Sequence, residues 1–163
     1  MPLNSINLNI RPKIEQDTAF LERLHRSTRP DLLQLGLPDP LLENLMQMQF
    51  NARQTSYHTH FPDAKYSIIE TKGEAIGYLI VNTNDETIRL VYIALLPQAR
   101  NQGYGRHLLK ILQTEATNTN KPLRLSVDAQ NTPAKHLYLS SGFQVKNDDG
   151  ANLEMIWLGH ANG

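Results

Sequence analysis

The segment Leu95–Leu112, LLPQARNQGYGRHLLKIL, places two glycines and three cationic side chains where an apolar stretch becomes a predicted helix. Glycines ahead of a first helical turn let several backbone N–H groups converge without obstruction from a Cβ atom. The helix N-terminus adds a partial positive charge, which favours a phosphate by about 0.3–1 kcal/mol. Arg100 and Arg106 can add charge-assisted hydrogen bonds on either side. The segment therefore predicts a turn that binds a diphosphate through backbone amides, without a metal.

Two better-known phosphate-binding turns do not fit this segment. A P-loop requires a lysine followed by serine or threonine after its second glycine, and Gly103 is followed by Tyr104-Gly105-Arg106. A dinucleotide-binding fingerprint requires a third glycine where Leu108 stands, and it opens a βαβ unit early in a chain. The structural alternative is a tight strand-to-helix turn whose glycines serve steric needs alone.

A second segment, SVDAQNTPAKHLYLSSGF from Ser126 to Phe143, follows the next predicted strand. Taken alone, it predicts a helix entry at Asn131, a first-turn proline at Pro133 and a half-buried aromatic ring at Tyr138. None of these features by itself indicates catalysis.

Together, the two segments resemble the GNAT superfamily of N-acetyltransferases. The acetyl-CoA turn of that family reads R/Q-x-x-G-x-G/A, and residues 100–105, RNQGYG, fit it. The family's next strand and helix carry N-x-x-A-x-x-L-Y followed by G-F, and the matching residues are Asn131, Ala134, Leu137, Tyr138, Gly142 and Phe143. The motifs cover roughly a third of the chain, from about Ile88 to Val145. The amino-terminal third, which shapes the acceptor site in this family, matches only in architecture.

The resemblance implies that acetyl-CoA is the acyl donor and that its diphosphate binds the amides from Gln102 to Arg106. Backbone groups of Ile93 and Leu95 would pair with the pantetheine arm, Asn131 would hydrogen-bond the cofactor, and Lys135 could reach its adenosine phosphates. Tyr138 matches the tyrosine usually assigned as general acid. The expected cofactor-binding residues are Ile93, Leu95, Arg100, Gln102, Gly103, Tyr104, Gly105, Arg106, Asn131 and Lys135.

The chain has no cysteine, which excludes an acyl-cysteine intermediate and favours direct attack by an amine in a ternary complex. An amine with the pKa of lysine, ~10.4, costs on the order of 4.6 kcal/mol to deprotonate at neutral pH, so a general base is expected. The central strand IRLVYIALL carries no acid, and Tyr92 stands where a carboxylate would be convenient. Three acids at or beside other strands could supply a general base through a water molecule, although a role as an exposed surface acid is favoured for each: Glu70, Asp128 and Glu154.

Composition and charge narrow the class of protein. The 163 residues are 40% hydrophobic, carry a formal net charge of +0 and show neither a signal peptide nor a membrane-spanning run. We therefore expect one cytoplasmic GNAT-like domain over residues 1–163, with no affinity for nucleic acid or membrane. Its partners would be a small-molecule or protein amine and, by analogy with the family, a second copy in a homodimer. The window from Thr87 to Thr114 contains no acid, which suits an anionic ligand.

Hydrophobic periodicity and turn residues predict the elements that position these motifs. Strands are expected near 6–10, 65–70, 75–81, 88–96, 123–127, 143–145 and 153–158, and helices near 15–26, 39–55 and 132–141. A further helix is expected after the glycine turn, with Leu108, Leu109 and Leu112 facing the sheet. The segment 27–38 is expected to be mostly loop. This order predicts a mixed, mostly antiparallel sheet of about seven strands with about four helices on its faces. The resemblance adds a V-shaped cofactor cleft between two central strands.

Two other interpretations stay open at this point. The chain could be a binding module that keeps the acyl-CoA site without turnover, or a nucleotide-phosphate binder with the same turn. His58 and His60, two apart in YHTHF, would share one face of an extended segment. They lack a neighbouring cysteine or acid, so an acceptor-binding role is favoured over a metal site. His25, on a predicted helix, is expected at the surface.

Overall fold

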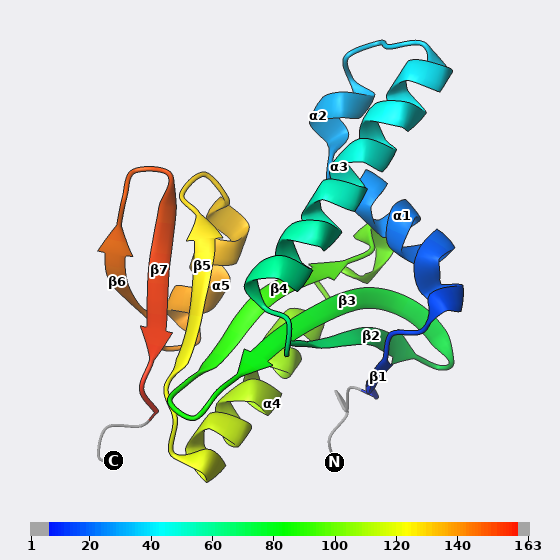
Figure 1. Ribbon diagram of the computed structural model, residues 1–163. Helices are drawn as coiled ribbons and strands as arrows, with labels where there is room; N and C mark the ends of the chain where they lie inside the picture. The colour runs from blue at the N-terminus through cyan, green and yellow to red at the C-terminus, as the bar shows by residue number, and fades with distance from the viewer. Residues whose placement is uncertain (1–6, 160–163) are drawn as a thin grey trace. The chain divides into compact units, whose positions relative to one another are not determined.

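A computed structural model describes residues 7–159 of the chain (Figure 1). In chain order the elements are β1 (Asn9–Pro12), the 3-10 helix η1 (Glu15–Asp17), α1 (Thr18–Ser27), α2 (Pro30–Leu33), α3 (Asp39–His60), β2 (Lys65–Thr71), β3 (Glu74–Thr83), β4 (Ile88–Leu95), the 3-10 helix η2 (Pro97–Ala99), α4 (Tyr104–Thr119), β5 (Leu123–Asp128), α5 (Thr132–Ser140), β6 (Gln144–Asp148) and β7 (Asn152–Trp157).

The strands form a seven-stranded sheet in the order β1-β2-β3-β4-β5-β7-β6. β4 and β5 are parallel, whereas β1 with β2, β5 with β7 and β6 with β7 are antiparallel. The expected mixed, mostly antiparallel sheet is therefore confirmed. The chain divides into two compact units: an amino-terminal unit of Asn7–Leu79 with Ile93–Ala99, and a carboxy-terminal unit that includes residues 80–92 and 100–159.

The helices of the amino-terminal unit bury apolar faces that their residue spacing predicts. The buried residues of α1 include Phe20, Leu21 and Leu24, and a cluster on α2 and α3 is formed by Leu32, Leu42 and Met46. Gly77 of β3 meets β4 so closely that a Cβ there would lie 2.6 Å from the Ala94 carbonyl oxygen. A glycine is therefore required sterically at this point of the sheet.

Two predicted elements of this unit differ from the structure. A short helix, α2, occupies part of the segment expected to be loop, because Pro30 at its first turn has a φ angle compatible with a helix. The chain thus has five α-helices within residues 7–159, rather than about four. The next helix, α3, continues to His60, past the expected end at Thr55, because no glycine or proline interrupts it before Pro62. Ile6, included in the first predicted strand, lies outside the described residues.

The carboxy-terminal unit is organised around β5. The residues of α4 that are buried are Leu108, Leu109, Leu112 and Ala116, whose spacing defines one helix face. Helix α5 ends in a Schellman motif: the Phe143 N–H donates to the Tyr138 carbonyl at 3.0 Å, and the Gly142 N–H donates to the Leu139 carbonyl at 3.1 Å. Gly142 has a φ of 96°, as expected for the glycine that ends this helix. None of the helices between residues 7 and 159 is long and apolar enough to span a membrane.

Candidate functional site

The glycine turn opens α4 with its first amide groups uncapped by any side chain. Asn101 (φ 61°) and Gly103 (φ 87°) both adopt left-handed backbone angles. Gly103 is the N-cap residue, and its carbonyl accepts the first helical hydrogen bond from the His107 N–H at 3.0 Å. The first N–H groups of an α-helix have no intrahelical acceptor, and no side chain within residues 7–159 caps those of α4. These amides form a concentrated donor site for an anion.

The structure brings the two sequence motifs into contact. A Cβ on Gly105 would lie 3.3 Å from Leu137 Cδ2, so the first turn of α4 packs directly on α5. The Arg106 guanidinium donates to Ser140 Oγ at 3.2 Å, which adds a polar contact between the same two helices. The glycine at position 105 therefore has a packing role in addition to its predicted place in the turn.

Asn131 and Lys135 have local partners within the carboxy-terminal unit. Asn131 Oδ1 accepts a hydrogen bond from the Ala134 N–H at 3.2 Å, which makes Asn131 the N-cap of α5. The Lys135 ammonium donates to the Ala129 carbonyl at 3.1 Å, in the loop between β5 and α5. The helix-entry role predicted for Asn131 is confirmed, while contacts of both residues with a cofactor stay predictions.

Tyr138 lies inside the unit, with 7% of its surface exposed. Its ring packs against Phe143 with the centroids 5.8 Å apart. Burial raises the pKa of the Tyr138 phenol above its ordinary value. The phenol therefore stays protonated at neutral pH and could donate its proton. No residue between 7 and 159 is hydrogen-bonded to this hydroxyl, which leaves it available to a ligand.

The parallel ladder between β4 and β5 is short. Only Ile88–Leu90 of β4 pairs with Leu123–Leu125 of β5. Within the same unit, β5 continues to Asp128, and among residues 7–159 its backbone groups beyond Leu125 do not pair with β4. Such groups require other hydrogen-bond partners. An extended amide-bearing chain such as a pantetheine arm has the donors and acceptors to pair with them.

Two predicted cofactor contacts lie in the amino-terminal unit. Ile93 and Leu95 are both half-buried on β4. Leu95 Cδ2 lies 2.7 Å from the position of a Cβ built on Gly77. Their pairing with a pantetheine arm stays a prediction.

Each of the three carboxylates considered as a general base already has a partner. Glu154 forms an ion pair with Arg89. Arg89 belongs to the segment from Thr87 to Thr114 that contains no acid, and its charge is therefore neutralised by an acid from another strand. Asp128 Oδ1 accepts from the Gln130 N–H at 2.7 Å. Glu70 pairs with Arg11, and the pKa of Glu70 is lowered, chiefly by that hydrogen bond. A carboxylate whose oxygens already accept hydrogen bonds or form an ion pair is less available to take a proton from an amine, so none of the three is assigned that role.

The two histidines of YHTHF do not share the face of an extended segment. Both lie near the end of α3, where residues two apart point in roughly opposite directions. The His58 ring stacks on Tyr66 with centroids 4.7 Å apart, and His60 Nδ1 lies 2.9 Å from the Ser56 carbonyl oxygen. The expectation that they lie together on one face is wrong, because α3 extends through both.

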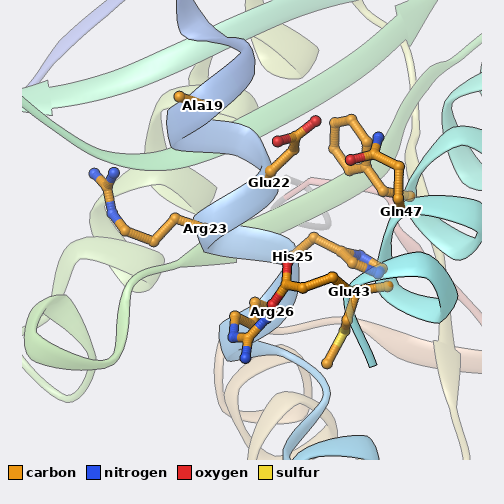
Figure 2. A pocket seen from close by; sticks show the side chains of 9 residues that line it. Ala19, Glu22, Arg23, His25, Arg26, Glu43 and Gln47 are labelled. Carbon is orange, nitrogen blue, oxygen red and sulfur yellow. Dashed lines mark hydrogen bonds and ion pairs between the residues drawn. The ribbon is translucent and has the colours of Figure 1, made fainter. Parts of the chain in front are cut away.

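The burial of His25 was not expected from the sequence. The sequence predicts His25 at the surface, but only 5% of it is exposed, and its ring packs edge-on against Phe50 at 5.8 Å. Figure 2 shows it in a recess between α1 and α3, which also contains the Arg26–Glu43 ion pair. Its Nε2 has no hydrogen-bond partner among residues 7–159. His25 lies four residues after Leu21 on the helix, a spacing that places it on the apolar face and could have identified its burial.

Comparisons with known proteins identify the family. A model of the acetyltransferase (GNAT) family matches residues 21–143. The chain is structurally similar to the PaiA N-acetyltransferase of Thermoplasma acidophilum in complex with coenzyme A, with 17% identity, a TM-score of 0.69, and coverage of 94% of this chain and 99% of the other. It is also similar to an acetyltransferase from Thermus thermophilus (19% identity, TM-score 0.66, coverage 93% and 96%).

A third similar structure is the ribosomal-protein-S18-alanine N-acetyltransferase from Escherichia coli, with 20% identity, a TM-score of 0.63, and coverage of 94% of this chain and 95% of the other. At these identities the solved structures establish a common fold. A search of curated protein sequences finds no match.

Proposed function

Because this chain belongs to the acetyltransferase (GNAT) family, we propose that it transfers an acetyl group from acetyl-CoA to an amine. The observation that carries the proposal is the contact between the glycine turn and α5. Gly105 packs on Leu137, and Arg106 donates to Ser140, so the uncapped amides of α4 and the helix that carries Tyr138 belong to one packed assembly.

The residues present fit the cofactor. The uncapped N–H groups at the start of α4, which follow the left-handed Gly103, would hold its diphosphate. Backbone groups on the β4-facing edge of β5 beyond Leu125 would pair with its pantetheine arm. Acetyl-CoA supplies the activated thioester, and the chain supplies its position and a proton donor.

Tyr138 is the residue we assign as proton donor. Its pKa is raised by burial, so it carries its proton at neutral pH and can protonate a leaving thiolate. No cysteine is available for a covalent acyl intermediate, which supports direct attack by the amine. Because the candidate carboxylates are engaged elsewhere, the amine would lose its proton to solvent or react as an already weak base. Turnover should then rise with pH until the acceptor amine is neutral.

A ligand-stabilisation experiment tests the cofactor assignment first. Unfolding is followed in parallel titrations with acetyl-CoA, CoA, ATP and NAD. A ligand at 100 times its dissociation constant stabilises the chain by about 2.7 kcal/mol. Stabilisation by acetyl-CoA and CoA alone supports the proposal, and stabilisation by ATP or NAD instead would indicate a nucleotide binder. Absence of any shift contradicts the proposal.

The transfer itself is tested by thiol release from acetyl-CoA across a library of amines. Amine-dependent release identifies the acceptor class. Thiol release that is slow and independent of every amine would instead favour a binding module without acetyltransfer. The variant Arg100→Ala/Gly105→Asp serves as the negative control, because it removes a cation and adds a carboxylate at the turn.

A further inference from the structure

A second recess in the carboxy-terminal unit lies along α4. It is bounded by α4, by the end of α5 and by β7, and its volume is about 540 Å³. We name it the α4 groove. Its lining residues include Arg106, Lys110, Gln113, Ser140, Ser141 and Trp157. At 1.5 Å per residue, its α4 wall runs about 18 Å from Arg106 to Asn118, away from the glycine turn.

The charged side chains that line the groove are both positive. Arg106 and Lys110 are four residues apart and therefore lie on the same helix face, about 6 Å apart at their Cβ atoms. No acidic residue of the described chain lines the groove. Within residues 7–159, neither cation forms an ion pair. Two uncompensated cations beside a recess attract an anion.

The neutral lining residues supply hydrogen-bonding groups. Ser140 Oγ accepts from the Arg106 guanidinium at 3.2 Å, which holds that guanidinium against the α5 wall. The Gln113 amide donates to the Ser141 carbonyl at 2.9 Å. Ser141 Oγ is buried and has no hydrogen-bond partner among residues 7–159. Buried hydroxyls are ordinarily satisfied, and rotation about a single side-chain torsion would turn this one toward a ligand.

The other recess, between α1 and α3, has a different charge pattern. Its Arg26 and Glu43 neutralise each other as an ion pair, and Glu22 adds a further acid. Figure 2 shows Glu22 extending from α1 and Gln47 from α3, the two helices that border the recess. A lining with both acidic and basic side chains favours neither an anionic nor a cationic ligand. The α4 groove, whose charged lining residues are both positive, favours an anion.

We propose that the α4 groove is a binding site for a small, multiply charged oxyanion, bearing either phosphate or carboxylate groups, and that it is separate from the acetyl-CoA site. Lys110 and the Arg106 side chain would supply the charge-assisted hydrogen bonds, and Ser141 Oγ a neutral one. The proposal does not depend on the proposed acetyltransfer. The sequence predicts that Arg106 flanks the cofactor diphosphate, but its guanidinium donates to Ser140 on the α5 wall of the groove, and Lys110 lies one helical turn farther from the glycine turn.

The groove contains its own reporter. Trp157 lines it and is the single tryptophan of the chain, so intrinsic fluorescence follows this site directly. The full chain is titrated with pyrophosphate and with citrate, which represent the phosphate and carboxylate sources, at constant ionic strength set with sodium chloride. A saturable change in emission, with a matching rise in Tm, is expected for at least one anion and none for chloride.

Two matched variants assign the change to the groove. Lys110→Gln should weaken binding of the active anion about tenfold, because it removes one charge-assisted contact. Lys146→Gln makes the same change in net charge on an exposed residue of β6 outside the groove, and should change the affinity less than twofold at physiological salt. Ser141→Ala should weaken binding severalfold while raising the Tm of the unliganded chain, because an unsatisfied hydroxyl is removed.

Three results would overturn the proposal. Equal weakening by the two lysine variants would mean general charge attraction. No response of fluorescence or Tm to pyrophosphate or citrate would mean that the groove binds neither class. Displacement of the anion by CoA, with Lys110→Gln weakening CoA binding by the same factor, would assign the groove to the cofactor site. Loss of acetyltransfer without loss of the fluorescence response would contradict only the proposed function.

Discussion

Gly105 and Leu137 mark the point where the two functional motifs meet, with only 3.3 Å between a Cβ placed on Gly105 and Leu137 Cδ2. That separation is tighter than ordinary van der Waals contact, so any side chain at position 105 requires Leu137 to move. The contact explains physically why a glycine of the turn and a leucine of the next helix belong to one site. It also makes the pair energetically coupled.

A double-mutant cycle tests this coupling. Gly105→Ala gains helix propensity of up to about 1 kcal/mol, but its methyl group presses on Leu137. In a Leu137→Ala background that pressure is gone, so Gly105→Ala should be more favourable there by at least about 0.5 kcal/mol. Urea unfolding of the four proteins measures the coupling. Additive effects, within the error of the unfolding free energies, would show that α4 and α5 do not meet as described.

Tyr138→Phe separates proton donation from cofactor binding. The phenyl ring should keep the packing against Phe143, so CoA affinity should change less than twofold. Loss of the proton donor should lower kcat about 100-fold. Thiol-release kinetics and CoA titration are measured on the unmodified protein and on Tyr138→Phe. Full activity of Tyr138→Phe would remove this residue from the proton-donor role.

His25 should make stability depend on pH in a narrow window. Burial, with Arg53 and Arg29 adding repulsion, lowers the pKa of His25 below its ordinary 6.5. Below pH 6.5 the unfolded chain binds a proton that the folded chain does not, so stability is greatest above that pH. It falls as the pH drops from 6.5 toward the folded pKa, and this contribution is constant below it.

Urea midpoints at closely spaced pH values between 8 and 5 measure this effect. His25→Phe keeps an aromatic ring against Phe50 and should abolish the decline in this window, whereas the exposed control His136→Gln should retain it. A decline of the same size in His25→Phe would assign the pH dependence to another group.

Asp17 should provide a second pH dependence at lower pH. It is buried, and both of its carboxylate oxygens accept from Arg11, at 2.7 and 2.9 Å, while one also accepts from the Ile14 N–H at 2.8 Å. The hydrogen bond from Arg11 is the main cause of the lowered pKa of Asp17. Because the folded pKa lies below the ordinary 3.8, the stabilisation is present above pH 3.8 and is lost as the pH falls through the folded value.

Asp17→Asn should destabilise the chain by about 3 kcal/mol at neutral pH, since it leaves Arg11 with weaker partners in a partly buried site. Glu70→Gln removes the other partner of Arg11, but this carboxylate is more exposed and the loss should be smaller. Chemical denaturation at pH 7 and at pH values below 3.8 compares the two variants. A larger effect for Glu70→Gln would reverse the assigned order of the two contacts.

The glycine turn and the α5 entry were predictable because their signals are local. Left-handed backbone at Gly103 and N-capping by Asn131 follow from residue type within a few positions of the chain. The Arg89–Glu154 ion pair was not predictable, because it depends on a sheet order in which β5 lies between β4 and β7. The Lys135 contact with Ala129 likewise depends on the detailed path of a loop. The predicted end of α3 was wrong, because no residue type that usually ends a helix occurs before Pro62.

The pairing of β1 with β2 has a kinetic consequence. Asn9 pairs with Glu70, and the intervening 60 residues include η1, α1, α2 and α3. Closing such a long loop costs chain entropy that local helices do not require, so the helices can form before this ladder closes. The Arg11 contacts with Glu70 would then be absent from the folding transition state. Weakening the Arg11–Glu70 contacts should accelerate unfolding with little effect on the refolding rate. The first strand, β1, would then join the sheet late, after the helices of its unit have formed.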